Sequence, residues 1–375
     1  MEDVRIVGNG SELQGVGRLT DGRVVFVPNA LCGELVRIEV IRETPRYCEG
    51  RLVEVLESAP ARRTPDCPAY GHCGGCQGRH MSYAETLTLK RQRVFDALER
   101  IGGLQNPCVF ETIGCEFPDR CRNKAEYPIG KDATGRICIG AYAAGSHEIV
   151  PLKDCLLQKE ASVRALAWFS EHLHELRCAG QLAALVTRVN RAGRMMLILC
   201  AKAPVMPEIR SILPKLTASL PELDSVYFLL QNRRPAHALD GQCTHLWGAK
   251  TLDEQLFDLT FSVSPQSFFQ VNPIQTEILY QKALEAAGLS ENCNARVLDA
   301  YCGAGTISLA AARQAGHVTG VEIVAPAVAD AKANARRNHL AAKTTFICGD
   351  APRQIAKLIQ DGCAFDAALL DPPRK

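Results

Sequence analysis

The sequence predicts a multidomain protein with a small N-terminal β-barrel, an α+β middle segment and a C-terminal doubly wound α/β domain. The length of 375 residues is too great for one ordinary domain. Residues 1–58 read as short strands separated by turn glycines. The last third alternates strands with helices, which is typical of a parallel sheet covered on both faces. We expect that C-terminal sheet to be incomplete, because only four strands can be read in it.

The barrel prediction depends on alternation. Val36, Ile38 and Val40 alternate with polar residues, as the strands of a small barrel do. The following residues 59–68 are rich in proline and arginine and read as a linker. A helix is then predicted to begin after Ser82, because Ser82 with Glu85 forms a capping-box pattern. The segment from about 110 to 260 mixes strands with helices and has little clear periodicity.

The C-terminal domain begins with a strand that ends at Asp299, followed by the glycine turn "YCGAG" and an alanine-rich helix. Glycines at 303 and 305 allow the backbone to pass close to a ligand. Carboxylates also follow the other strands, where parallel strands bring their carboxyl ends to one edge. They are Glu322, Asp350 and Asp371, the last within Asp-Pro-Pro.

This set favours S-adenosylmethionine over a nicotinamide cofactor. An acid at the end of the second strand can accept hydrogen bonds from ribose hydroxyls in either case. A dinucleotide-binding turn, however, would carry a third glycine where this chain has Ser308. Ordinary turn glycines would explain Gly303 and Gly305, but not acids at all four strand ends.

Composition narrows the class of protein. Net charge is +2 at pH 7, so nucleic-acid binding would depend on local patches. Two runs are candidates, although each alone is more often an ordinary solvated face: Lys90, Arg91 and Arg93, and Arg122, Asn123 and Lys124. There is no N-terminal signal region and no apolar run long enough to span a bilayer. We expect a cytoplasmic protein with no membrane partner.

Three of the 17 cysteines are clustered in "CPAYGHCGGCQGRH", residues 67–80. In a reducing compartment such a cluster indicates a metal site more often than disulfides. Cys67, Cys73 and Cys76 suit an iron–sulfur cluster, and zinc with His72 or His80 as a further ligand is the alternative. Most other cysteines, such as Cys200, are expected to be small core residues.

Four motifs together resemble the RNA uracil-C5-methyltransferases, which make 5-methyluridine in 23S ribosomal RNA and in transfer RNA. They are "CPAYGHCGGCQGRHMSY", "SPQSFFQVNP", "VLDAYCGAGTISLA" and "DPPRK". The resemblance extends over almost the whole chain and is stronger to the ribosomal branch. It implies a TRAM barrel at 1–58, a central iron–sulfur and RNA-binding domain at 59–79 and 110–258, and a methyltransferase domain at 80–109 and 259–375.

The resemblance also implies site residues. The [4Fe–4S] ligands would be Cys67, Cys73, Cys76 and Cys155. The contacts to S-adenosylmethionine would be Gln270, Tyr301, Thr306, Glu322, Asp350 and Asp371. From its residue type alone, Gln270 reads as a polar residue at a helix start. "CRNKAEY" at 121–127 resembles a family stretch, but Cys121 stands where the family has an aromatic residue.

In the family, a cysteine thiolate adds to carbon 6 of uracil and activates carbon 5 toward the methyl donor, and a glutamate is the general base. The resemblance places both residues beyond Lys375. We therefore expect an inactive fragment of a monomeric enzyme of 23S ribosomal RNA that does not act on DNA. Three alternatives stay open: a transfer-RNA uridine methyltransferase, a non-catalytic RNA-binding module, and an amino-directed methyltransferase. Arg374 counts against the last, because an aromatic residue often follows Asp-Pro-Pro there.

Overall fold

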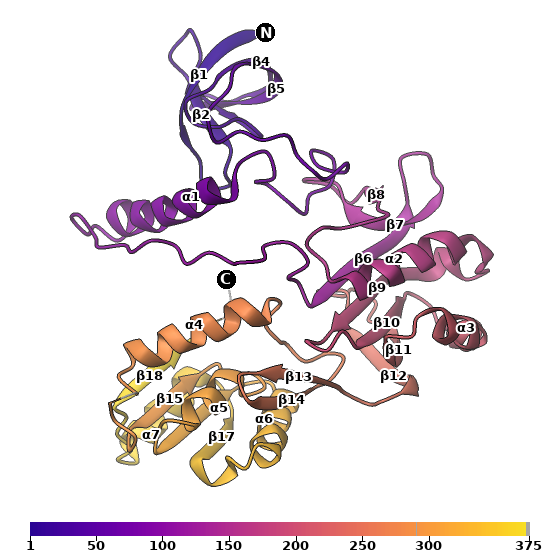
Figure 1. Cartoon of the computed structure of the whole chain (residues 1–375), viewed down its shortest axis with the longest axis vertical. Coiled ribbons are helices and arrows are strands. Elements are labelled where there is room, and N and C mark those ends of the chain that lie inside the picture. The colour runs from indigo at the N-terminus through magenta and orange to yellow at the C-terminus, as the bar shows by residue number, and fades with distance from the viewer. Residues whose placement is uncertain (290, 373–375) are drawn as a thin grey trace. The chain divides into compact units, whose positions relative to one another are not determined.

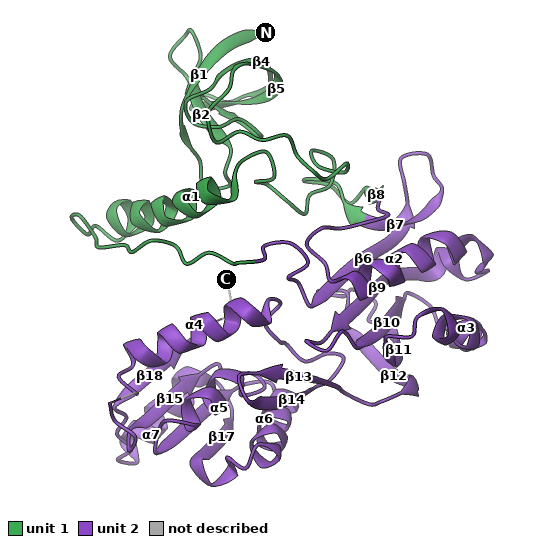
Figure 2. Cartoon of the chain, in the orientation of Figure 1, with its two compact units in different colours: residues 1–116, 141–150 green, residues 117–140, 151–375 purple. Residues whose placement is uncertain are grey.

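The computed structural model describes residues 1–289 and 291–372. Figure 1 shows its helices and strands, and the chain divides into two compact units. The first unit comprises residues 1–116 and 141–150, and the second comprises residues 117–140 and 151–375 (Figure 2).

The first unit begins with a closed barrel in the strand order β1-β2-β3-β5-β4, as predicted. Val36 and Ile38 are fully buried in its core, as their alternation indicates. Gly17 allows close packing, because a Cβ there would lie 2.3 Å from Cγ1 of Val4. The strands are β1 (Glu2–Asn9), β2 (Gly15–Arg18), β3 (Val24–Val27), β4 (Leu35–Glu43) and β5 (Tyr47–Glu57).

An irregular segment follows the barrel and leads into α1 (Tyr83–Asp96). The predicted helix start is confirmed, since the Ser82 hydroxyl accepts a hydrogen bond from the Glu85 N–H at 3.3 Å. One π-helical segment, η1 (Ala97–Ile101), extends the helix to the glycines at 102 and 103.

A seven-stranded sheet in the order β12-β11-β10-β9-β6-β7-β8 follows, and the division into units passes through β7 and β8. All residues of β10 are buried, as expected of an apolar strand covered on both faces. Helix α2 packs on β6 and β9, and α3 packs on β11. The strands are β6 (Lys124–Lys131), β7 (Ile137–Tyr142), β8 (Ile149–Pro151), β9 (Leu182–Val189), β10 (Met195–Ala201), β11 (Leu223–Gln231) and β12 (Gly241–Gly248). The helices are α2 (Glu160–His172), η2 (Leu173–Glu175), η3 (Ala179–Gln181) and α3 (Met206–Ser219).

The hairpin of β13 (Leu252–Leu256) and β14 (Leu259–Val263) leads to a parallel sheet in the order β17-β16-β15-β18. Leu298 and Val321 pack with residues of α7, whereas Val297 and Val318 pack with residues of α4, α5 and α6. Helices therefore cover both faces, which confirms the predicted doubly wound fold. The elements are α4 (Pro273–Ala286), β15 (Arg296–Ala300), α5 (Thr306–Ala312), β16 (His317–Glu322), α6 (Ala325–Arg337), η4 (Ala341–Lys343), β17 (Thr344–Cys348), α7 (Ala351–Gln360) and β18 (Ala367–Leu370).

In the part of the chain that the structure describes, no helix has both the length and the apolar character that crossing a bilayer requires.

Candidate functional site

The strand register gathers three of the expected donor contacts at one edge of the C-terminal sheet. Ala300, the last residue of β15, lies opposite Val321 of β16 and Leu370 of β18. The residues that follow these three are Tyr301, Glu322 and Asp371. Because neighbouring parallel strands lie about 4.8 Å apart, these residues stand side by side at the carboxyl edge. Pro373 and Arg374 of the same motif lie outside the described residues.

The turn after β15 stays bonded to β16. The N–H groups of Tyr301 and Cys302 donate to the Val321 carbonyl at 2.8 and 3.0 Å, and the Gly303 N–H donates to Oε2 of Glu322 at 3.1 Å. Tyr301 has φ +67° and Gly305 has φ +80°, both in the left-handed region. A Cβ at Gly305 would also lie 3.1 Å from Cβ of Ala331. Both the backbone conformation and the close packing therefore favour glycine at this position.

Glu322 keeps accepting capacity toward a ligand. Its two oxygens accept the N–H groups of Gly303 and Val324, the latter at 2.8 Å. A carboxylate offers about four lone-pair sites, so about two remain for hydroxyl groups. The backbone bonds meanwhile fix the orientation of the carboxylate at the edge.

Asp299 lies beneath the turn rather than at the open edge. Its side chain is 2% exposed and accepts a hydrogen bond from the Ser308 hydroxyl. Burial raises the pKa of Asp299 to about 7. Ser308 stands where a dinucleotide-binding turn would have its third glycine, and here its hydroxyl joins α5 to the end of β15.

Two other expected contacts have partners within the fold. The Thr306 hydroxyl lies 2.8 Å from the hydroxyl of Tyr280 on α4. Asp350 caps α7, accepting the Arg353 N–H at 3.3 Å, and is exposed. Both residues are near strand ends, as the sequence indicates. Each of these bonds stabilises the fold whether or not a donor molecule is bound.

Gln270 lies in the loop of residues 264–272, between β14 and α4. Its neighbour Phe269 is 5% exposed and belongs to the same hydrophobic cluster as Cys302 and Phe346. That cluster lies under the glycine turn, so the loop is packed against the donor-site side of the domain. The sequence indicates Asn123 only as part of a basic run and gives no signal for Arg188, yet both residues hold this loop.

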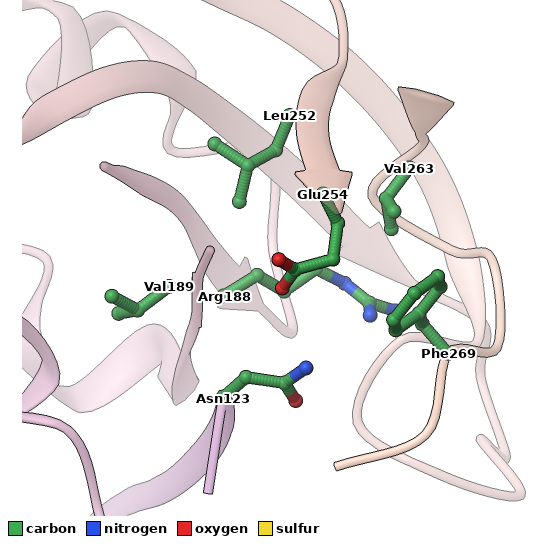
Figure 3. A pocket seen from close by; sticks show the side chains of 7 residues that line it. All are labelled: Asn123, Arg188, Val189, Leu252, Glu254, Val263 and Phe269. Atoms are coloured by element: carbon green, nitrogen blue, oxygen red, sulfur yellow. The ribbon is translucent and has the colours of Figure 1, made fainter. Parts of the chain in front are cut away.

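A small pocket lies where the seven-stranded sheet meets this loop and the β13–β14 hairpin (Figure 3). The side chains of Asn123, Arg188 and Glu254 converge in it, and all three are less than 10% exposed. Burial lowers the pKa of Arg188 to about 10 and raises the pKa of Glu254. The remaining lining residues are Val189, Leu252, Val263 and Phe269. The candidate basic patch at 122–124 is thus not a uniformly solvated face, because Asn123 points into the protein.

The three clustered cysteines lie in one loop of the first unit and are each half-buried. The Gly75 N–H donates to Sγ of Cys73 at 3.4 Å, and the Gly74 N–H donates to the Tyr142 carbonyl at 2.9 Å. A Cβ at Gly74 would lie 3.2 Å from Cα of Ala144, so this turn also needs a small residue.

The fourth expected ligand, Cys155, belongs to the second unit. Arg120 donates to the Cys155 carbonyl at 2.9 Å and pairs with Asp154 at 2.7 Å. Among the described residues, no group of three or more Cys, His, Asp or Glu side chains is arranged to hold a metal ion. The donor chemistry fits an iron–sulfur cluster, whereas the four-ligand arrangement stays a prediction.

A buried polar network connects the cysteine loop with the barrel. Glu34 is fully buried and accepts Arg62 Nη2 at 2.7 Å and the Leu31 N–H at 2.8 Å. The Tyr70 hydroxyl lies 2.6 Å from Nδ1 of His80 and 2.9 Å from Oδ1 of Asn29. Burial lowers the pKa of His80 to about 4, so its ring is neutral at pH 7. Nδ1 of His80 is engaged with Tyr70, whereas its buried Nε2 has no hydrogen-bond partner among the described residues, so zinc remains the alternative to an iron–sulfur cluster.

Comparisons with known proteins agree with the architecture. A family model described as TRAM domain matches residues 2–53, and one described as Methyltransferase domain matches residues 291–371. An uncharacterized RNA methyltransferase of Clostridium tetani is 38% identical over 379 residues, covering 99% of this chain and 81% of the relative. One from Caldanaerobacter subterraneus subsp. tengcongensis is 39% identical over 381 residues, covering 99% and 83%.

Among solved structures, the Pyrococcus abyssi tRNA (uracil-54, C5)-methyltransferase in complex with S-adenosyl-L-homocysteine is similar to this chain with a TM-score of 0.75. The match covers 99% of this chain and 83% of that one, with 23% sequence identity. This similarity concerns the fold.

Proposed function

The chain belongs to the RNA methyltransferase family, and we propose that its enzyme methylates carbon 5 of a uridine in 23S ribosomal RNA, with S-adenosylmethionine as the methyl donor. The observation that carries the donor site of this proposal is the alignment of Tyr301, Glu322 and Asp371 at one sheet edge beside a glycine turn. Parallel α/β sheets bind their ligands outside the carboxyl ends of the strands.

The proposed donor site combines a carboxylate, a glycine turn and several further contacts. Glu322 accepts hydrogen bonds from the ribose hydroxyls, for which its unused lone pairs suffice. The turn at Gly303 and Gly305 allows the backbone to approach the donor. Tyr301, Asp371 and Gln270 complete the site, with Thr306 and Asp350 as further contacts. Asp299 supports the turn from below and does not contact the donor.

The methyl transfer itself needs an activated carbon 5, which in the proposed mechanism follows from addition of a thiolate to carbon 6. No described residue is assigned to that role. Cys302 is buried, and burial raises its pKa far above the ordinary thiol value. Cys363 is half-buried in the loop before β18.

The proposal includes a [4Fe–4S] cluster held by Cys67, Cys73, Cys76 and Cys155. When bound, it would brace the loop and orient RNA, because the proposed reaction transfers no electron. The Gly75 N–H donates to Sγ of Cys73, the atom that would bind iron, and so helps to orient this side chain. Anaerobically purified protein should contain about four iron atoms per chain and absorb visible light, and Cys73→Ser should lose both. Zinc without iron would contradict this part of the proposal.

The substrate is tested by deleting the gene and analysing nucleosides of separated RNA classes by mass spectrometry. The 23S ribosomal RNA of the deletion strain should lack one or more 5-methyluridines that the parent strain contains. Loss from transfer RNA instead would assign the enzyme to the other branch. Unchanged 5-methyluridine in both classes would contradict the proposal.

A further inference from the structure

The loop of residues 264–272, which carries Gln270, is held from two sides within the second unit. On the side of the C-terminal sheet, the Ser267 hydroxyl donates to Oδ2 of Asp330 on α6 at 2.6 Å. On the side of the seven-stranded sheet, Gln266 Nε2 donates to the carbonyls of Leu239 and Gly241 at 2.9 and 3.1 Å. The loop thus connects the two sheets of this unit rather than merely joining β14 to α4.

Arg188 makes the most unusual of these contacts. It lies on β9, is 6% exposed, and its guanidinium donates to the carbonyls of Pro265 and Ser267. Burial is the cause of its lowered pKa, and among the described residues no carboxylate is paired with it. A buried cation is costly unless its hydrogen bonds are satisfied. Two carbonyls of one loop are therefore the partners that its planar fork of donors serves.

Asn123 supplies a second anchor directly at the candidate donor contact. Its Nδ2 donates to the Gln270 carbonyl at 3.0 Å, and its backbone N–H donates to the Val271 carbonyl at 2.7 Å. Asn123 and Arg188 are adjacent, because Lys124 of β6 lies opposite Arg188 of β9. One corner of the seven-stranded sheet therefore fixes the loop on both sides of Phe269, the buried residue next to Gln270.

We propose that Arg188, with Asn123 as its neighbour, is a positioning residue that sets Gln270 for the methyl donor. The corner of the seven-stranded sheet then controls donor affinity without contacting the donor. This inference rests on the proposed function, because it takes Gln270 to be a donor contact.

The experiment is a double-mutant cycle on the 375-residue chain, read out by calorimetric titration with S-adenosylhomocysteine. Arg188→Met removes the donors while keeping a long side chain. We expect it to raise the Kd about tenfold, as for one misplaced hydrogen bond. In a Gln270→Ala background, Arg188→Met should have no further effect, because both changes act through the same contact. Asn123→Ser should show the same non-additivity with a smaller effect.

A matched control separates positioning from folding. Arg194→Met removes an arginine directly before β10, the strand that pairs with β9; Arg194 pairs with Asp224 and is bonded to no residue of the loop. It should leave the Kd unchanged. Hydrogen exchange of the Phe268 and Phe269 amides should quicken in Arg188→Met, while the amides of β15 keep the wild-type rate. Should Arg188→Met fail to fold, Asn123→Ser and Ser267→Ala replace it, and the Kd of each is compared with and without Gln270→Ala.

The outcomes distinguish this inference from the proposed function. No binding by the wild-type chain would contradict the proposed donor site itself. Wild-type binding with an unchanged Kd in folded Arg188→Met and Asn123→Ser would overturn the positioning role alone. Full additivity with Gln270→Ala would also overturn it, because Arg188 would then act through some other group.

Discussion

The donor edge of the C-terminal sheet and the cysteine loop of the first unit are two candidate sites built in different ways. At the donor edge, strand register alone aligns Tyr301, Glu322 and Asp371, and the turn bonds to its own neighbouring strand. The cysteine loop has no such frame. It is tied to the rest of its unit by distant partners: the Tyr70 hydroxyl bonds to Asn29 of the barrel, and the Gly74 N–H donates to the Tyr142 carbonyl.

The difference shows what regular structure contributes to a site. In a parallel sheet, the end of each strand is fixed by hydrogen bonds, so residues that follow the strands become neighbours without any ligand. In an irregular loop, the spacing of cysteines determines which chemistry is available, but their geometry depends on remote packing and on the group bound. Substitutions at the two sites should therefore have different effects on stability and on ligand binding.

The largest effect is expected at Glu34. Glu34→Ala leaves the Arg62 guanidinium without its partner and the Leu31 N–H without an acceptor, inside the protein. We expect a loss of about 3–5 kcal/mol in the free energy of unfolding of the first unit, measured by urea denaturation. Glu39→Ala, which removes an exposed pair with Arg51, is the control and should cost less than about 1 kcal/mol. Equal costs would contradict the role of the buried network.

A glycine pair tests the donor edge. Gly305→Ala meets both the left-handed backbone and Ala331, whereas Gly362→Ala meets the same backbone strain at φ +83° with open space around it. We expect about 1–2 kcal/mol of destabilisation at Gly362 and about 1 kcal/mol or more beyond that at Gly305. Thermal unfolding measures both. Indistinguishable values would show that the turn does not pack as tightly as described.

The pH dependence of stability tests the scaffold of the cysteine loop. Burial, helped by the nearby Arg62, lowers the pKa of His80 to about 4 from an ordinary value of 6.5. The unfolded chain therefore binds a proton that the folded chain resists, and stability is lost as the pH falls from about 6.5 toward 4.

Relative to His80→Gln, the wild type should lose about 2 kcal/mol between about pH 7.5 and pH 5. The Glu34 carboxylate acts in the opposite direction on His80, so its protonation at still lower pH should deepen the loss. Parallel stability curves for the two proteins would rule out a buried neutral ring at this position.

The smallest expected effect concerns donor affinity. Glu322→Gln halves the number of accepting oxygens at the end of β16 and should raise the Kd for S-adenosylhomocysteine about tenfold. Asp350→Asn is the informative companion, since asparagine caps a helix as well as aspartate does. It should leave stability unchanged, so any loss of affinity would identify Asp350 as a donor contact in addition to a cap.

Several features of the fold could be predicted from sequence because their signals are local. The alternation around Val36 and Ile38, the cap at Ser82 and the strand that ends before Gly303 each depend on a few adjacent residues. The residues that hold the sites in place have no such signal. Arg188 bonds to Ser267, and Glu34 bonds to Arg62, across long stretches of chain. The sequence identifies Asp299 as an acid at a strand end, but its burial beneath Ser308 depends on how α5 packs.

The most direct test of the central claim is a crystal structure of this chain with S-adenosylhomocysteine. The account predicts one molecule at the carboxyl edge, with a ribose hydroxyl within hydrogen-bonding distance of Glu322 and the ligand lying between Tyr301 and Asp371. A ligand bound elsewhere, or a Glu322 carboxylate turned away from it, would contradict the account.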